Sequence, residues 1–161
     1  MEAKNNGSEA FENALASATG GPNEPSGKPD DRRLNICVIF TSAESTLAAL
    51  QTASGFANNL GAQITLMAPL VVPFPLPLED PPVLLDWNKS RFRYIASQSP
   101  VKTVVRLFLC RDKVETLKRA LSPKSMIVIG SRKRRWPFTA EKRLARELRR
   151  TGHEIIFAET K

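Results

Sequence analysis

Strand-like apolar runs alternate with helical periodicity from residue 34 onward, and this alternation constrains the fold more than any other feature. Strands are predicted over residues 34–40, 63–68, 101–109, 125–129 and 153–158. Four helices are predicted between them. One lies between Ser42 and Gly61, one spans residues 83–97, one is opened by Asp112 with Glu115, and one lies between Thr139 and Gly152. This alternation predicts an α/β fold: a three-layer α/β/α sandwich around a five-stranded parallel sheet with right-handed crossovers.

The composition of the strands also predicts their order. Residues 35–40 and 126–129 are unbroken apolar runs, which are typical of strands buried on both faces. The third strand contains Lys102 and Arg106, and acidic residues flank the short fifth strand, so these two are predicted at the edges. The order 3-2-1-4-5 satisfies both conditions. In that order ligands are expected where the direction reverses, at the carboxyl ends of the first and fourth strands, near residues 40–42 and 130–135.

Two further features bound the class of protein. Residues 1–32 are rich in Gly, Asn, Ser, Glu and Pro, which predicts a disordered tail before a domain spanning residues 33–161. The longest apolar run, residues 67–78, is broken by four prolines and is too short for a bilayer-spanning helix. With no basic and apolar leader at the N-terminus, a cytoplasmic protein without membrane contact is expected. Cys37 is expected in the core and no disulfide is expected.

The positive charge is concentrated near the C-terminus. The chain has a formal net charge of +8, whereas residues 1–33 hold four basic and six acidic side chains. Residues 131–150 alone contain nine Lys and Arg against Glu141 and Glu147. Such a patch indicates affinity for anions.

Three short segments carry a resemblance to a known family. They are Thr41-Ser42-Ala43-Glu44-Ser45 after the first strand, Leu60-Gly61-Ala62 before the second, and Ile127-Val128-Ile129-Gly130-Ser131 at the fourth. In this order and spacing the chain, over residues 33–160, resembles the universal stress protein family. The resemblance implies the sheet order above, a nucleotide site at the switch point and a homodimer. We expect that dimer to form through the fifth strand, whose edge is unpaired.

The sequence departs from the family's nucleotide motif at most positions. The aspartate that nucleotide-binding members carry after the first strand falls at Phe40 or Thr41 here. Gly130 matches the first glycine of the family's G-x₂-G-x₉-G-[ST] signature, but the second falls on Lys133 and the third near Arg143. Glycines in such loops let backbone N–H groups approach phosphate oxygens. No cofactor is therefore expected, and ATP or AMP is disfavoured.

Two sets of candidate binding residues follow from these patterns. At the switch point, an anionic ligand would contact the residues Thr41, Ser42, Gly130, Ser131, Arg132 and Lys133. A polyanion or acidic partner would contact the residues Arg134, Arg135, Trp136, Lys142, Arg146 and Arg149. In the structural alternative, Ser42 only caps its helix, Trp136 covers the sheet edge, and the cations form a solvated surface. The proline-rich segment 69–82 either covers the ligand cleft, packs on a partner or packs on the domain itself.

No catalytic set is visible. His153 is the only histidine and is expected to be structural, and no cluster has metal-ligand spacing. No nucleophile elbow, P-loop or acid/base pair appears. We therefore expect a universal-stress-protein-like regulatory domain that binds and does not catalyse, with a degenerate nucleotide site. The alternative is a nucleic-acid- or polyanion-binding accessory protein that uses the basic loop and last helix. An enzyme of the wider adenine-nucleotide-hydrolase-like superfamily is the least favoured interpretation.

Overall fold

A computed structural model of the chain describes residues 34–132 and 139–160. The strands are β1 (Asn35–Ile39), β2 (Gln63–Val71), β3 (Thr103–Cys110), β4 (Met126–Arg132) and β5 (Glu154–Thr160). The helices are α2 (Ala43–Leu60), α3 (Leu85–Ser97), α4 (Lys113–Ala120) and α5 (Ala140–Arg150). All strand pairs are parallel and their order is β3-β2-β1-β4-β5, which confirms the predicted fold class. The disorder expected for residues 1–32 lies outside the described residues.

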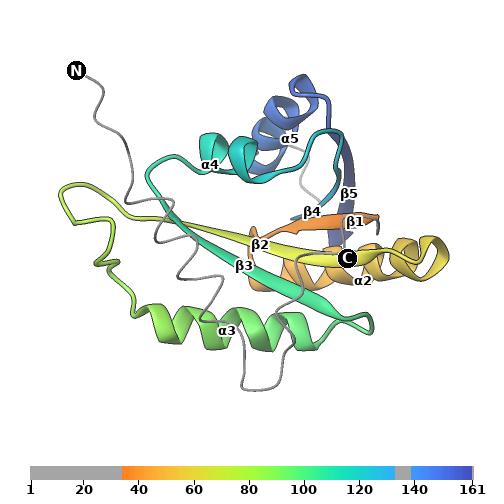
Figure 1. The fold of residues 1–161 in the computed structure, drawn as a ribbon, viewed down its shortest axis with the longest axis horizontal. Helices are drawn as coiled ribbons and strands as arrows, with labels where there is room; N and C mark the ends of the chain where they lie inside the picture. Colours follow the sequence, from red (N-terminus) through yellow and green to blue (C-terminus); the bar gives the residue numbers. More distant parts are fainter. Residues whose placement is uncertain (1–33, 133–138, 161) are drawn as a thin grey trace. The chain divides into compact units, whose positions relative to one another are not determined.

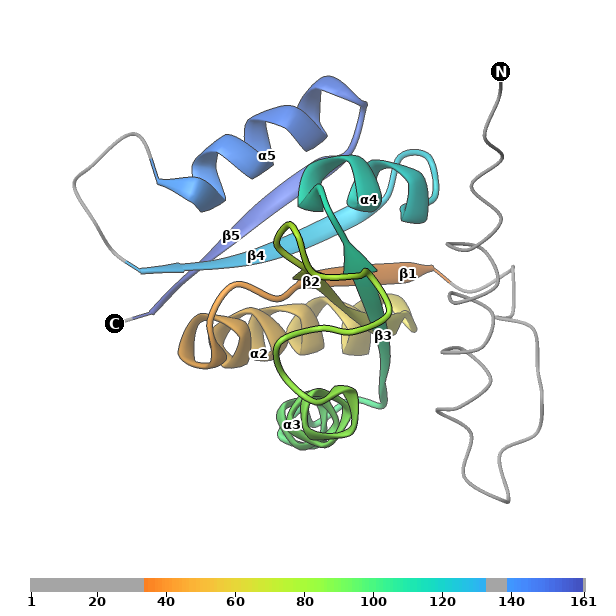
Figure 2. The ribbon, with the colours of Figure 1, turned by 90° about the vertical axis from the view of Figure 1, so that its left-hand side faces the viewer.

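Helices cover both faces of the sheet. α2 and α3 lie on one side, and α4 and α5 lie on the other (Figures 1 and 2). Each face has its own apolar cluster. The first contains Ile36, Leu66 and Phe92, and the second contains Ile39, Leu117 and Leu148. No helix within residues 34–132 and 139–160 is long and apolar enough to cross a membrane.

The helix ends follow the chemistry of the sequence. The Ser42 side chain accepts a hydrogen bond from the Ser45 N–H, and Gly61 ends α2 in the left-handed region at φ 62°. Asp112 and Thr139 cap α4 and α5 in the same manner as Ser42. These four ends were predicted from the sequence, and the structure confirms them.

Several strand ends differ from their predicted positions, and the difference is largest at the ends of β2 and β4. β2 continues past residue 68 to Val71 and includes Pro69, which lies opposite Phe108 of β3. Phe40 donates its N–H to the Met67 carbonyl, so the backbone N–H and C=O groups of Met67 point toward β1. Every second residue of β2 from Met67, including position 69, points its backbone groups to the same side. The last pair between β1 and β2 is Ile39 with Met67, so β1 has ended before it reaches Pro69. The missing N–H of this proline therefore removes no hydrogen bond between the two strands. The other strand, β4, ends at Arg132 instead of before Gly130.

Candidate binding surfaces

The switch point between β1 and β4 is tied together by backbone and hydroxyl contacts. The Thr41 hydroxyl donates a hydrogen bond to the Gly130 carbonyl at 3.0 Å. The Thr41 N–H donates to the Thr46 hydroxyl at 3.3 Å. Two of the predicted ligand-binding residues, Thr41 and Gly130, are therefore brought together, and they bond to each other.

Gly130 has a packing role at this position. A Cβ added there would lie 1.8 Å from the Ser45 carbonyl oxygen and 2.4 Å from its carbonyl carbon. The first turn of α2 therefore lies directly against β4, and only a residue without a side chain fits between them. Ser131 and Arg132 follow as strand residues that pair with Glu159 and Thr160 of β5. The prediction of a loop beginning at Gly130 was wrong, because the glycine marks a close helix–strand approach and not the end of the strand.

The N-terminus of α2 is capped by a side chain of the protein itself. Ser42 Oγ accepts from the Ser45 N–H at 3.2 Å, so the cap prediction for Ser42 is the one observed. Glu44 places a carboxylate in the first turn, where it offsets the positive end of the helix dipole. Arg132 Nη2 lies 3.2 Å from Glu44 Oε2, and this exposed ion pair joins β4 to α2 across the switch point. The cation predicted to hold a ligand therefore has an internal carboxylate partner.

Phe40, directly after β1, lies among aromatic and cationic side chains. Its ring meets Phe92 of α3 edge-on at 4.8 Å between centroids, and the Arg91 guanidinium lies 5.2 Å from its centroid. Lys113 Nζ, on the first residue of α4, donates to the Phe40 carbonyl at 3.3 Å. Burial lowers the pKa of Lys113, while the nearby Glu141 carboxylate opposes that shift. Arg91 and Lys113 at this edge were not anticipated, because only tertiary packing brings α3 and α4 to it.

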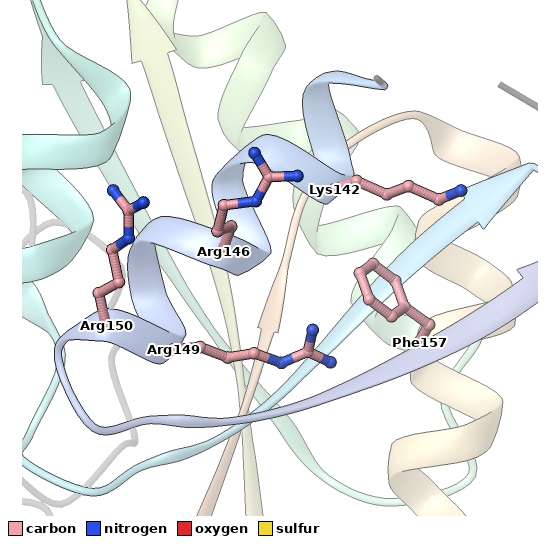
Figure 3. Close-up of a pocket in the computed structure, with 5 residues that line it drawn as sticks. All are labelled: Lys142, Arg146, Arg149, Arg150 and Phe157. Carbon is pink, nitrogen blue, oxygen red and sulfur yellow. The ribbon is translucent and has the colours of Figure 1, made fainter. Parts of the chain in front are cut away.

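A second surface lies between α5 and β5, on the side of the sheet opposite α2. An open hollow of about 560 Å³ is lined by Lys142, Arg146, Arg149, Arg150 and Phe157. We call it the α5–β5 groove. Figure 3 shows Arg149 extending from α5 along β5 toward Phe157. The Arg149 guanidinium lies 5.6 Å from the Phe157 ring centroid and donates to the Ile155 carbonyl at 3.4 Å.

The groove gathers three residues that the sequence assigned to polyanion binding. Lys142, Arg146 and Arg149 stand at positions i, i+4 and i+7, a spacing that places them on one face of a helix. Arg150 and Phe157 also line the groove and were not among the predicted contacts. Phe157 had no recognisable signal, because its contact with α5 depends on the pairing of β5 at the sheet edge. The remaining candidates Lys133, Arg134, Arg135 and Trp136 lie outside the described residues.

His153 and both cysteines are buried. His153 is buried and its Nδ1 accepts the Ser125 N–H at 3.2 Å, a contact that anchors the start of β5. Burial lowers the pKa of His153. Cys37 and Cys110 are buried and free, and burial raises the pKa of Cys37 to about 11. Within the described ranges, no group of three or more His, Cys, Asp and Glu side chains lies close enough to hold a metal ion.

The sheet order and the two helix layers define the class of this protein: a parallel α/β sandwich with one switch point between β1 and β4. Solved structures of universal stress proteins share this fold. A family member from Burkholderia pseudomallei is 21% identical, with 80% of this chain and 98% of that chain covered and a TM-score of 0.55. The universal stress protein from Archaeoglobus fulgidus is 15% identical over 77% of this chain and 92% of that chain, with a TM-score of 0.54. No protein-family model and no curated protein sequence matches the chain.

Proposed function

We propose that this protein is a regulatory binding domain on the universal stress protein fold, without enzymatic activity and without the family's usual mode of ATP binding. Cytoplasmic location and a role in stress are part of the proposal. The observation that carries it is the contact between Gly130 and Ser45, in which the glycine serves helix packing. The A. fulgidus universal stress protein was also solved in complex with dAMP. An adenine nucleotide is therefore the ligand to test first.

The internal contacts at the switch point support a degenerate site. A phosphate bound at the first turn of α2 would have to displace the Glu44–Arg132 ion pair or accept a carboxylate beside it. The sequence offers Lys133 where the second glycine of the motif would stand. A cationic side chain cannot replace a backbone cradle with the same geometry.

Calorimetric titration with ATP and with AMP, each with magnesium, tests this proposal. We expect no binding tighter than about 1 mM for ATP, equivalent to only about 4 kcal/mol of binding free energy. A matched titration with the Glu44→Gln variant removes the carboxylate without removing Arg132. Micromolar, magnesium-dependent binding of ATP to the parent protein would contradict the proposal.

The second candidate function is binding of a polyanion or acidic partner by the basic stretch and α5. The row of cations in the α5–β5 groove favours it. Substitution of Arg132, Lys133, Arg134 and Arg135 by Ser should lower the salt concentration at which the protein elutes from heparin. Elution of this variant at the same salt concentration as the parent would exclude the basic stretch as a contact.

A further inference from the structure

The acidic side chains of α5 interact with α4 and with Arg150, whereas four cations of α5 line the groove beside β5. Glu147 pairs with Lys118 of α4 at 3.7 Å and with Arg150 at 3.0 Å, and the Glu141 carboxylate acts on Lys113 of α4. The acidic side chains of α5 are therefore engaged with α4 and with Arg150. Lys142, Arg146 and Arg149 line the groove beside β5, together with Arg150, which carries the ion pair with Glu147. An anion in the groove would meet four cations among the lining residues, one of which, Arg150, is paired with Glu147.

The groove offers no apolar anchor for a protein partner. None of the exposed large apolar side chains of the described residues lies on α5 or β5. Phe157, the one aromatic residue in the groove, is half-buried and already covered by the Arg149 guanidinium. The centres of protein–protein interfaces are enriched in exposed aromatic and apolar anchors, whereas nucleic-acid interfaces are dominated by cations that contact phosphates. This contrast favours a phosphate backbone over an acidic protein.

The edge of β5 is also partly closed to strand addition by a peptide. Glu154 donates its N–H to the Ser125 carbonyl, so the backbone groups of Glu154 point toward β4. Those of the next residue, Ile155, point away from β4 toward the open edge of the sheet. The outward Ile155 carbonyl already accepts from Arg149. An acidic peptide that added as a strand would have to displace this guanidinium. A ligand held by side-chain cations alone would not.

We propose that the α5–β5 groove binds the phosphodiester backbone of a nucleic acid without reading its sequence. The inference rests on the second proposed function and names its ligand class. From Lys142 to Arg149 the helix rises about 10 Å, which matches roughly three nucleotides along one strand of a duplex. Arg146 and Arg149 supply planar guanidinium groups that bind phosphate oxygens in pairs. Exposed Glu154 and Glu159 lie at the two ends of β5, outside the groove lining.

Fluorescence anisotropy with a labelled single strand and a duplex of the same length tests the proposal across a salt series. The Lys142→Gln, Arg146→Gln, Arg149→Gln variant should bind at least tenfold more weakly than the parent. Its log–log salt slope should fall by about two units, at about 0.7 per single-strand phosphate contact. The stronger of the two probes then identifies the form of nucleic acid that fits the groove.

The matched control removes three cations of α3 and of the segment before β3, as Lys89→Gln, Arg93→Gln and Lys102→Gln. This control has the same net charge as the groove variant and should bind nucleic acid within twofold of the parent. Equal losses in both variants, or no loss in the groove variant, would overturn the proposal. Equally tight binding of poly-glutamate at matched length would overturn the assignment to nucleic acid. Because Arg149 also contacts Phe157, the Lys142→Gln, Arg146→Gln variant provides a second test with the Phe157 contact retained.

The outcome is separable from that of the heparin experiment. A heparin shift of the Arg132–Arg135 variant, together with unchanged DNA binding by the groove variant, would keep polyanion binding and reject the groove. The calorimetric titration with ATP is independent of both.

Discussion

Replacement of Gly130 by alanine is the sharpest test of the switch-point structure. The added Cβ would lie 1.8 Å from the Ser45 carbonyl oxygen. An ordinary contact is about 3.5 Å, so α2 and β4 must separate by roughly 1.7 Å. Both neighbours are backbone, and no side-chain rotation can relieve the overlap. Overpacking of a well-packed core costs about 1–3 kcal/mol, and we expect Gly130→Ala to reach at least the upper end of this range.

This loss would be measured by thermal and urea denaturation. A domain of this size loses about 2–4 °C in Tm for each kcal/mol, so we expect a decrease of roughly 10 °C. Gly55→Ala is the matched control, since a Cβ there meets nothing within 4 Å and lies inside α2. It should stabilise the protein by up to about 1 kcal/mol, because alanine favours the helix. A Gly130→Ala protein that melts within about 2 °C of the parent would refute the reasoning.

Two further predictions concern β5. Burial lowers the pKa of His153, so the unfolded chain takes up a proton at a higher pH than the folded one. The free energy of unfolding should therefore fall as the pH drops below about 6.5. Urea denaturation at several pH values should show a smaller fall for the His153→Gln variant than for the parent. An identical dependence of the unfolding free energy on pH in both proteins would contradict this prediction. The homodimer through β5 stays a prediction, and Arg149→Ala should strengthen it by freeing the Ile155 carbonyl and removing a like charge at the edge. Sedimentation velocity that shows only monomer for both parent and variant, at tens of micromolar protein, would exclude this dimer.

Features that depend on a few neighbouring residues were predictable. Ser42, Asp112 and Thr139 begin their helices as expected, because a cap hydrogen bond involves side chain and backbone only three residues apart. The sheet order also followed from the sequence, since charge in a strand and burial on two faces are incompatible.

Features set by tertiary approach were not predictable in the same way. Gly130 resembles a strand terminator in the sequence, yet it is a strand residue pressed against Ser45, which is 85 positions away along the chain. Similarly, the cations of α5 were identifiable from helical spacing, but Phe157 and the direction of Glu147 toward Lys118 required the packed structure. The sequence therefore predicted three of the four cations of α5 that line the groove, but not the residues of other elements that they lie beside.

The arrangement of α5 bears on function through its energetic cost. Leu144, Ala145 and Leu148 already bury the apolar face of the helix in the second core cluster, so its polar positions carry little of the core. Interspersed charges of both signs would suffice for solubility and would avoid repulsion along the row of cations. The chain instead pairs Glu147 with Lys118 of α4 and with Arg150, and four cations of α5 line the hollow beside β5. A bound phosphate backbone would relieve that repulsion, so the same side chains that lower the stability of the free protein would favour the complex.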